Sequence, residues 1–297
     1  ITSNGPTPIY LNAKTGVKEG TVNLGSAEAY SVTNDEGKYI LYCNHANGGE
    51  TFKIWRSTGV DVAPELYHSF TNTTSLPMGA KMKVNGSLDG DALIVITNEG
   101  IAGVTESGMI TVVEVKGGSI VNTSVVDLSG VGTWGEAPVN IGTVVAASTD
   151  MADGWFTSQY EPSEFRWIKG DGTLGAAIPS DMPGWGLNPN CLDAKSFNNV
   201  EYVTLFVVSH FPAWGMGPEL YLYDVTDKAQ VTGGDVTQVP GAVLSNRAIT
   251  WYQTGSYSIA SGDVVIAPSA DGFTFQLYYY DHNSQVIGGY AADCIKR

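Results

Sequence analysis

The chain has 297 residues and a formal net charge of −15, from 15 basic and 30 acidic residues. So acidic a surface repels phosphate backbones and anionic lipid head groups, which argues against binding to nucleic acid or to a charged membrane surface. Charged residues make up only 15% of the chain and Gly reaches 36, so the polar surface must consist mostly of Ser, Thr, Asn and Gly, as in many secreted β proteins.

The cysteines Cys43, Cys191 and Cys294 are odd in number, far apart and outside any Cys-x-x-Cys pattern. This spacing argues against a zinc site or a disulfide framework, and Cys43, in an apolar run, is expected to be a small buried hydrophobe. No apolar run reaches the roughly 18 residues of a membrane-spanning helix, so we expect no transmembrane segment. The chain begins at Ile1 without Met or a signal peptide, and we expect a mature, trimmed or incomplete start.

The N-terminal residues resemble the later part of a repeated unit. Ile1–Gly5 (ITSNG) is similar to Ile96–Gly100 (ITNEG), and PIYLNAKTGVKEGTVNL then reads as one strand, a Lys-Thr-Gly turn and another strand. The sequence offers no segment for the first strands of this unit. Either upstream residues are absent, or the repeated units close into a ring irregularly, or an extra two-stranded ribbon precedes five full units.

The best-formed example of the unit lies at residues 27–57. Three strands are predicted at Ala29–Thr33, Lys38–Cys43 and Thr51–Arg56. A turn at Asn34–Gly37 separates the first two, and a loop at Asn44–Glu50 separates the second from the third. The alternation of residues predicts Tyr39, Leu41, Cys43 and Trp55 as packing residues. Trp167, in a later third strand, is expected in the core for the same reason.

The end of the second strand recurs along the chain and marks the repeat. The spacing is roughly 50–60 residues, in the range of propeller blades. Each marker is followed by a strand rich in aromatic or β-branched residues, a tight turn and an outer strand such as SIVNTSVVDL. The markers are Cys43-Asn44, Thr97-Asn98, Ser158-Gln159, Ser209-His210 and Ala267-Pro268.

This rhythm predicts an all-β fold, a single β-propeller of four-stranded antiparallel blades over residues 1–297. We expect six blades with the first incomplete, and five blades are the alternative. A pair of β-sandwich domains is the other architecture that the strand pattern allows. The predicted units span residues 1–25, 26–76, 77–131, 132–186, 187–243 and 244–297.

The loops that follow the second and fourth strands open on one face of a propeller, and we expect function there because a rigid scaffold fixes these loops. Three tryptophans fall in Gly-flanked loops, including Gly132–Glu136 and Pro183–Asn188, and could form a platform for a sugar ring or a peptide side chain. Packing at the seams between blades is the alternative. The candidate ligand-binding residues are Asn44, His45, Asn98, Glu99, Gln159, Glu161, His210, Trp134, Trp185 and Trp214.

His45 and His210 occupy equivalent loop positions and could contact a ligand, transfer protons or bind a metal, although bonding to a neighbouring backbone is the simpler interpretation. Glu99 and Glu161 could form the carboxylate pair of a glycosidase. The sequence lacks a G-x-S-x-G elbow, an H-E-x-x-H motif and a phosphate-binding loop. The fragments LDGD at 88–91 and GDGT at 170–173 fit hairpin turns better than calcium loops. We therefore predict no catalytic residues, no metal and no cofactor.

The repeat also resembles a known group of proteins. The segments DEGKYILYCNH, FKIWR, ADGWFTSQYEPSEFRWIKGDG and DVVIAPSADGFTFQLYYYD are similar to propeller domains of unknown function in surface lipoproteins of gut Bacteroidetes. The resemblance covers essentially the whole chain and implies a place on the outer face of the outer membrane, beside SusC/SusD-like uptake systems. It supplies no functional residues.

The sequence thus favours a non-enzymatic binding or accessory subunit of a nutrient uptake complex. A glycan or a peptide is the expected ligand, and outer-membrane transporter subunits are the expected partners. The alternatives are a propeller-fold glycan hydrolase or lyase, which would use the loop carboxylates and histidines, and a structural adhesion or assembly module.

Overall fold

The computed structural model places a series of β-strands in chain order. Every element in its described residues is a strand, and no helix occurs among them. The described residues are 7–12, 15, 17–34, 37–98, 109–127, 133–134, 137–138, 141–146, 153–158, 165–175, 187–197, 200–209, 219–227, 232–235, 260–269, 272–281 and 286–294.

A short ribbon comes first. β1 (Ile9–Leu11) and β2 (Lys18–Thr21) pair antiparallel, with Ile9 opposite Thr21 and a register shift at Tyr10/Leu11. This is the strand–turn–strand that the N-terminal sequence predicts.

The first full sheet contains four antiparallel strands in the order β3-β4-β5-β6. The backbone at Gly37 has a φ of 74°, which only Gly adopts without strain. Its amide donates to Asn34 Oδ1 at 3.2 Å and helps to close the first turn. The strands are β3 (Ser31–Thr33), β4 (Ile40–Cys43), β5 (Thr51–Ser57) and β6 (Glu65–Thr71).

The second sheet repeats this meander in the order β7-β8-β9-β10. Gly117 and Gly118 form the two-residue connection between its last two strands, with φ of 54° and 75°. Two successive positive φ angles match the twist of a hairpin and explain the Gly-Gly pair. The strands are β7 (Met78–Gly86), β8 (Ala92–Asn98), β9 (Met109–Lys116) and β10 (Ser119–Asp127).

The rest of the described chain forms one small ribbon and three further antiparallel sheets. The ribbon pairs β11 (Thr133–Trp134) with β12 (Ala137–Pro138). The sheets contain β13 (Ile141–Ala146), β14 (Asp153–Ser158) and β15 (Phe165–Lys169); β16 (Leu187–Phe197), β17 (Val200–Ser209), β18 (Glu219–Asp224) and β19 (Thr232–Asp235); and β20 (Ala260–Ser269), β21 (Gly272–Asp281) and β22 (Val286–Cys294).

The strand markers of the sequence fall at strand ends, within a residue or two. β4 ends at Cys43, β8 at Asn98, β14 at Ser158, β17 at Ser209 and β20 at Ser269. Each full sheet lies inside one of the predicted repeat units.

Two expected loops are corrected by the structure. Leu187 and Asn188 belong to β16, because that strand continues through a register shift between Asn188 and Cys191 instead of ending there. The segment around Trp134 is not a plain loop, since its backbone pairs with Ala137 in the β11–β12 ribbon.

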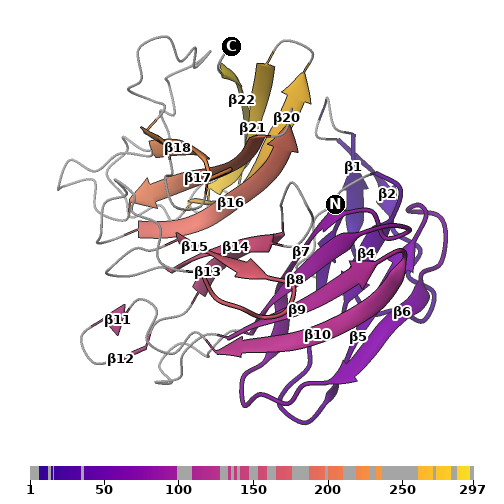
Figure 1. The fold of residues 1–297 in the computed structure, drawn as a ribbon. Coiled ribbons are helices and arrows are strands. Elements are labelled where there is room, and N and C mark those ends of the chain that lie inside the picture. Colours follow the sequence, from indigo (N-terminus) through magenta and orange to yellow (C-terminus); the bar gives the residue numbers. More distant parts are fainter. Residues whose placement is uncertain are drawn as a thin grey trace.

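Successive sheets contact one another in chain order through their early strands. β3 contacts β7, β7 contacts β13, β13 contacts β16, and β16 contacts β20. Figure 1 shows the sheets following one another, from the indigo and purple strands to the orange and yellow ones. The result is an all-β, β-propeller-like fold of consecutive antiparallel meanders.

The main core lies between the first two sheets. Leu41, Phe52 and Ile54 from the first sheet pack against Ile94 and Val113 from the second, all fully buried. Burial of each such side chain stabilises the fold by about 1.5–3 kcal/mol. The seven residues of β8 are all buried, as expected for a strand with neighbours on both edges and both faces.

Cys43 belongs to this core as a free thiol, and burial raises its pKa to about 12. The prediction of a buried small hydrophobe is confirmed. Trp55 is also buried, whereas Trp167 is only half-buried.

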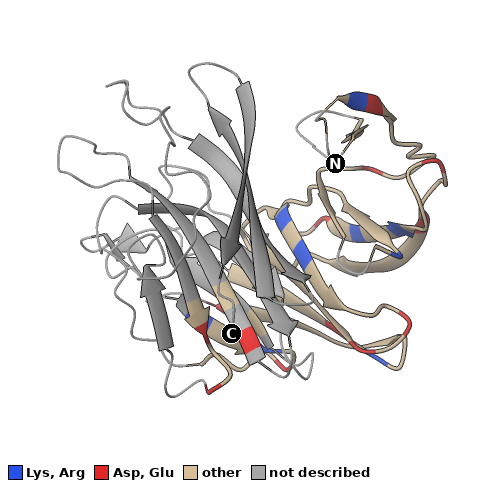
Figure 2. Cartoon of the chain, turned by 90° about the horizontal axis from the view of Figure 1, so that it is seen from above, with Lys and Arg blue, Asp and Glu red and all other residues tan. Residues whose placement is uncertain are grey.

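In Figure 2 most acidic residues of the described part lie on turns and connections rather than within the sheets.

Candidate functional site

The first two sheets have two distinct ends. We call the end where second strands finish and first strands begin the loop end, and the opposite end, which carries the tight hairpins, the turn end. The sequence predicts function at the loop end. There the connection 44–50 follows β4, and Ala46 pairs with Met78 of the second sheet through hydrogen bonds of 3.1 and 2.9 Å.

An aromatic pair lies on this loop end. Tyr30 directly precedes β3, and its amide donates to Cys43 O at 2.7 Å, which places it beside the end of β4. Its ring centroid is 4.9 Å from that of His45, with the ring planes inclined at 58°. Half of the Tyr30 surface is exposed (50%), and His45 is half-buried. Such a pair offers an aromatic face and ring polar atoms to the same ligand.

A carboxylate completes this loop. Glu50 Oε2 accepts hydrogen bonds from the Asn47 backbone amide at 2.7 Å and from Asn47 Nδ2 at 3.2 Å. The backbone bond, then the side-chain bond, and more weakly the charge of His45 hold the pKa of Glu50 below its usual value. The carboxylate is fully exposed, so it can accept further hydrogen bonds from a ligand.

Two predicted ligand contacts have their amides engaged inside the protein. Asn44 Nδ2 donates to Thr51 O at 3.0 Å, and its Oδ1 accepts from Lys53 N at 2.7 Å. Asn98, expected in a loop, is the last residue of β8 and is only 1% exposed. Its amide donates to Thr74 Oγ1 at 3.1 Å and accepts from Thr111 Oγ1 at 3.0 Å. These bonds favour a structural role, and ligand binding by either residue stays a prediction.

Of the seven other candidates, only Trp134 lies in the described residues, and its backbone belongs to β11. Glu99, Gln159, Glu161, His210, Trp185 and Trp214 lie outside the described residues. Their proposed roles, including the carboxylate pair of Glu99 and Glu161, stay predictions.

Sequence reasoning missed Tyr30, although a signal was present. The residue immediately before a first strand shares the loop end with the residue after the second strand, because the two strands are antiparallel neighbours. Applying this rule to the start of β3, next to the His45 loop, would have selected Tyr30.

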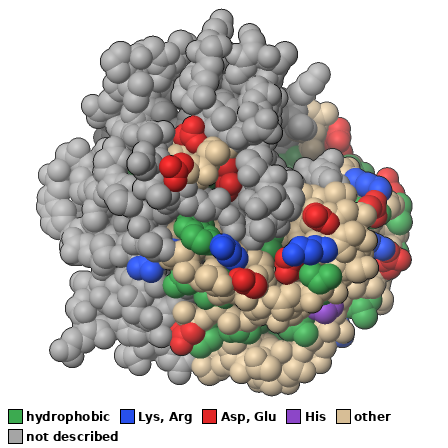
Figure 3. All heavy atoms as spheres, viewed as in Figure 1, with side chains coloured by type: hydrophobic (Ala, Val, Ile, Leu, Met, Phe, Trp, Pro, Cys, Tyr) green, Lys and Arg blue, Asp and Glu red, His purple; other side chains and the backbone are tan. Residues whose placement is uncertain are grey.

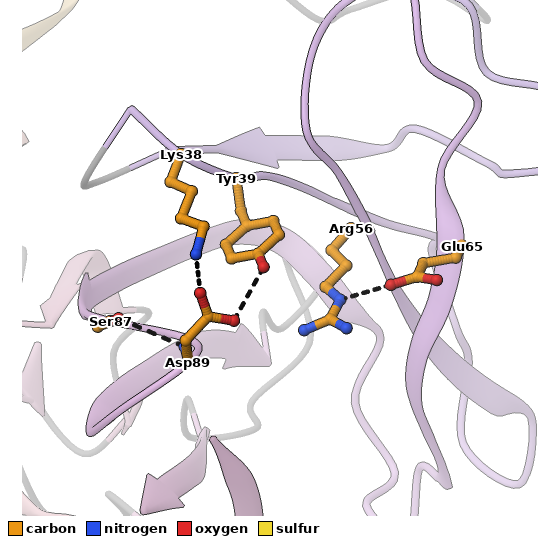
Figure 4. A network of polar contacts seen from close by, with 6 residues as sticks. All are labelled: Lys38, Tyr39, Arg56, Glu65, Ser87 and Asp89. Carbon is orange, nitrogen blue, oxygen red and sulfur yellow. Dashed lines mark hydrogen bonds and ion pairs between the residues drawn. The ribbon is translucent and has the colours of Figure 1, made fainter. Parts of the chain in front are cut away.

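The turn end carries a second polar cluster, which joins the first sheet to the second (Figure 4). Lys38 Nζ forms an ion pair with Asp89, and Tyr39 Oη donates to the same carboxylate at 2.8 Å. Arg56 Nε donates to Glu65 Oε1 at 2.8 Å. The guanidinium carbon of Arg56 lies 5.1 Å from the ring centroid of Tyr39, within the range of a cation–π contact.

This cluster acts mainly as an inter-sheet contact. Asp89 lies in the turn between β7 and β8, where its amide also donates to Ser87 Oγ at 3.3 Å. The LDGD segment is thus a hairpin turn that accepts a contact from the first sheet. GDGT is likewise a turn, since Gly172 N donates to Lys169 O at 2.8 Å. Within the described ranges, no group of three or more His, Cys, Asp or Glu side chains is arranged to hold a metal ion.

The described part of the chain also contains no helix with the length and apolar character needed to span a bilayer.

The fold and the loop-end cluster define a β-propeller-like protein with a candidate site at its loop end. The chain belongs to the family described as Domain of unknown function (DUF8500), whose model matches residues 1–293. No curated protein matches the chain significantly.

Solved structures resemble it at the level of fold. A DUF4623 family protein from Bacteroides eggerthii matches with a TM-score of 0.51 and 13% identity, over 96% of this chain and 63% of that one. This chain therefore spans about two thirds of the length of that protein. Such low identity shows a shared fold alone.

Two glycan-cleaving enzymes match less well. A GH43 endo-arabinanase from Bacillus licheniformis matches with a TM-score of 0.43 and 9% identity, over 92% of this chain and 95% of that one. A glycosyl hydrolase from Bacteroides ovatus matches with a TM-score of 0.42 and 11% identity, over 97% of this chain and 89% of that one. Similarity this low carries no argument about activity.

Proposed function

We propose that this protein is a non-enzymatic recognition module that binds a glycan or a peptide at its loop end. The observation that carries the proposal is the contact of half-exposed Tyr30, just before β3, with His45, just after β4. A rigid aromatic side chain supplies contact area at a small entropic cost, because few of its torsions must be fixed.

The polar groups around this pair suit ligands rich in hydroxyl or amide groups. The exposed carboxylate of Glu50 accepts hydrogen bonds, and the His45 ring can donate or accept according to its tautomer. An aromatic face combined with a few polar groups is the usual chemistry of a small-ligand site. An aromatic face and these hydrogen-bonding groups are sufficient to bind a ligand, and the proposed function asks for no bond cleavage.

The number of blades is a further part of this proposal. We infer six blades with an incomplete first blade, and the five meander sheets and leading β1–β2 ribbon of the described residues support this inference. In such a ring the loop ends of all the units face one side, so the candidate tryptophans and His210 would surround the same axis as Tyr30.

Location and partners are proposed from the sequence resemblance. We place the protein on the outer face of the outer membrane, as an accessory subunit of a nutrient transporter. Labelling intact cells with a membrane-impermeant reagent tests this location, and protection of the protein until the cells are lysed would contradict it.

Isothermal titration against glycan and peptide panels tests the binding function. We expect Tyr30→Ala to weaken binding of the best ligand by at least ten-fold through the lost stacking surface, corresponding to about 1.4 kcal/mol. Leu66→Ala is the matched control, because Leu66 is equally exposed (57%) but lies at the turn end of β6. Equal loss in both variants, or no heat from the unmodified chain, would contradict the proposal. Release of reducing sugar would instead establish the hydrolase alternative.

A further inference from the structure

The outer strand of the second sheet presents an edge on which no described strand pairs. β10 is the last strand in the order β10-β9-β8-β7, and no other described strand pairs with its outer edge. Figure 1 shows β10 running along the front of the molecule as the outermost strand of its sheet. An unpaired edge exposes backbone donors and acceptors that another strand can engage.

The two faces of β10 have different surroundings. Exposed and covered residues alternate along all nine positions, including through the register shift at Ile120/Asn122. On the covered face, Asn122 Nδ2 donates to Gly170 O at 2.9 Å, which fixes the strand against the third sheet. On the other face, Val121 and Val125 are 53% and 42% exposed.

The exposed row is uncharged at its centre. It consists of Ser119, Val121, Thr123, Val125 and Asp127. In Figure 3 the lower part of the described surface, where β10 runs, is mostly green and tan, and most charged side chains lie above it. In a protein of net charge −15, such a neutral stripe is where two identical molecules repel each other least.

The residues of β10 read almost the same in both directions about Thr123. When two antiparallel copies are paired with Thr123 opposite Thr123, Val121 lies opposite Val125 and Ile120 opposite Val126. Cross-strand pairs of β-branched side chains are favourable in sheets, and like charges are not opposed at any position. The end residue Asp127 faces Ser119 of the other copy.

The outer strand of the first sheet lacks this self-complementarity. β6 begins with Glu65, which is paired with Arg56, and continues ELYHSFT, which does not repeat in reverse. Both outer strands carry a register shift, β6 opposite Ile54/Trp55 and β10 at Ile120/Asn122, so the shift does not distinguish them. Charge is a feature by which edges resist pairing, and between Ser119 and Asp127 the strand β10 carries no charged residue and no Pro.

We propose that two copies of this chain associate through antiparallel pairing of β10 with β10, centred on Thr123. His68 Nε2 lies 3.2 Å from Thr123 Oγ1. This contact involves the side chain of Thr123 on the face of the strand, and it leaves the backbone edge of β10 available to the second copy. The two sheets then join into one continuous eight-stranded sheet across a two-fold axis, and the same surface is used by both subunits.

The association should be weak. One pair of nine-residue strands buries less surface than a standard protein interface of about 1,600 Å², so we expect a dissociation constant in the micromolar range. Sedimentation velocity of the full chain over a concentration series should show a monomer–dimer equilibrium, and a monomer at every concentration overturns the proposal.

A charge-swap pair tests the register. V121K/V125K places Lys opposite Lys at both symmetric sites and should weaken dimerisation by at least ten-fold. V121K/V125D places Lys opposite Asp at the same sites and should restore it. Both positions are exposed, and matching circular dichroism spectra would show that both variants fold. Equal behaviour of the two variants overturns the pairing.

Crosslinking provides a second measurement that does not depend on those variants. Directly opposed residues in an antiparallel pair have Cβ atoms about 4.5–5.5 Å apart, close to the geometry of a disulfide. T123C should therefore form a disulfide-linked dimer under mild oxidation, in excess over the unmodified chain. S119C is the control, because its partner position is Asp127. Equal crosslinking of the two variants means another contact and also overturns the proposal.

Discussion

The first and second sheets meet through polar groups at both ends of their interface, and the two ends differ in burial. At the loop end, Asn72 donates to Ala46 O and Leu76 O at 3.0 and 2.8 Å, and Thr74 donates to Asn72 Oδ1 at 2.7 Å, all buried. At the turn end, the paired side chains of Lys38 and Asp89 are 55% and 43% exposed.

This difference decides what each end contributes. A buried polar group that loses its partner bears the full cost of desolvation, whereas an exposed ion pair exchanges its partner for water. The loop end is therefore expected to fix how the two sheets dock. This docking in turn fixes the positions of Tyr30 and His45. The turn end is expected to add little stability.

The largest effect is expected at Gly79. Its φ is 109°, and an added Cβ would lie 2.4 Å from the backbone oxygen of Asn44. Gly79→Ala should lower the free energy of unfolding by about 3 kcal/mol, because both the backbone strain and the contact with Asn44 must be relieved. Gly59→Ala is the matched control, since it has no positive φ and no atom within 4 Å. Urea denaturation measures both, and equal midpoints would contradict the rigid loop end.

An intermediate effect is expected at Asn72. Asn72→Ala leaves the carbonyls of Ala46 and Leu76 without this donor in a buried site, which should cost about 2–3 kcal/mol. Ser69→Ala, at an exposed position of the preceding strand β6, should change stability by less than about 0.5 kcal/mol. The same urea experiment applies. A loss at Asn72 no larger than at Ser69 would mean that water replaces the side chain and that the loop end is not dry.

The smallest effect is expected at Asp89. Asp89→Ala removes the ion pair with Lys38 and the bond from Tyr39 Oη, yet should cost less than about 1 kcal/mol because the groups are exposed. Asp89→Asn keeps an acceptor for Tyr39 and should cost less still. The difference between wild type and Asp89→Asn should shrink at high salt, where surface charges are screened. A loss larger than that of Asn72→Ala would reverse the ranking of the two ends.

The sequence predicted the strands far better than the site. Alternation and repeated turn residues located β4, β5 and β10 closely, because strand pairing is local between neighbours in a meander. Asn98 shows the limit. A polar residue at the end of a strand looks like a loop contact, and only its neighbours Thr74 and Thr111, from a connection and from β9, show that its amide is used internally.

The prediction of Tyr39 as a packing residue holds in part. Its ring packs against the core of the first two sheets, and its hydroxyl bonds to Asp89 at the turn end. Sequence alternation sees only which face of a strand a residue occupies. It cannot show which residue of the next sheet, 50 positions later in the chain, meets the end of the side chain.

The amino-acid sequence by itself determined the order of the strands, the Gly-containing hairpins and the buried character of Cys43, since these follow from short-range sterics and from hydrophobicity. Only the tertiary structure decided that Asn44 and Asn98 face inward and that Tyr30 meets His45. These features depend on how separate sheets dock, and docking is set by contacts between residues that are distant in the chain.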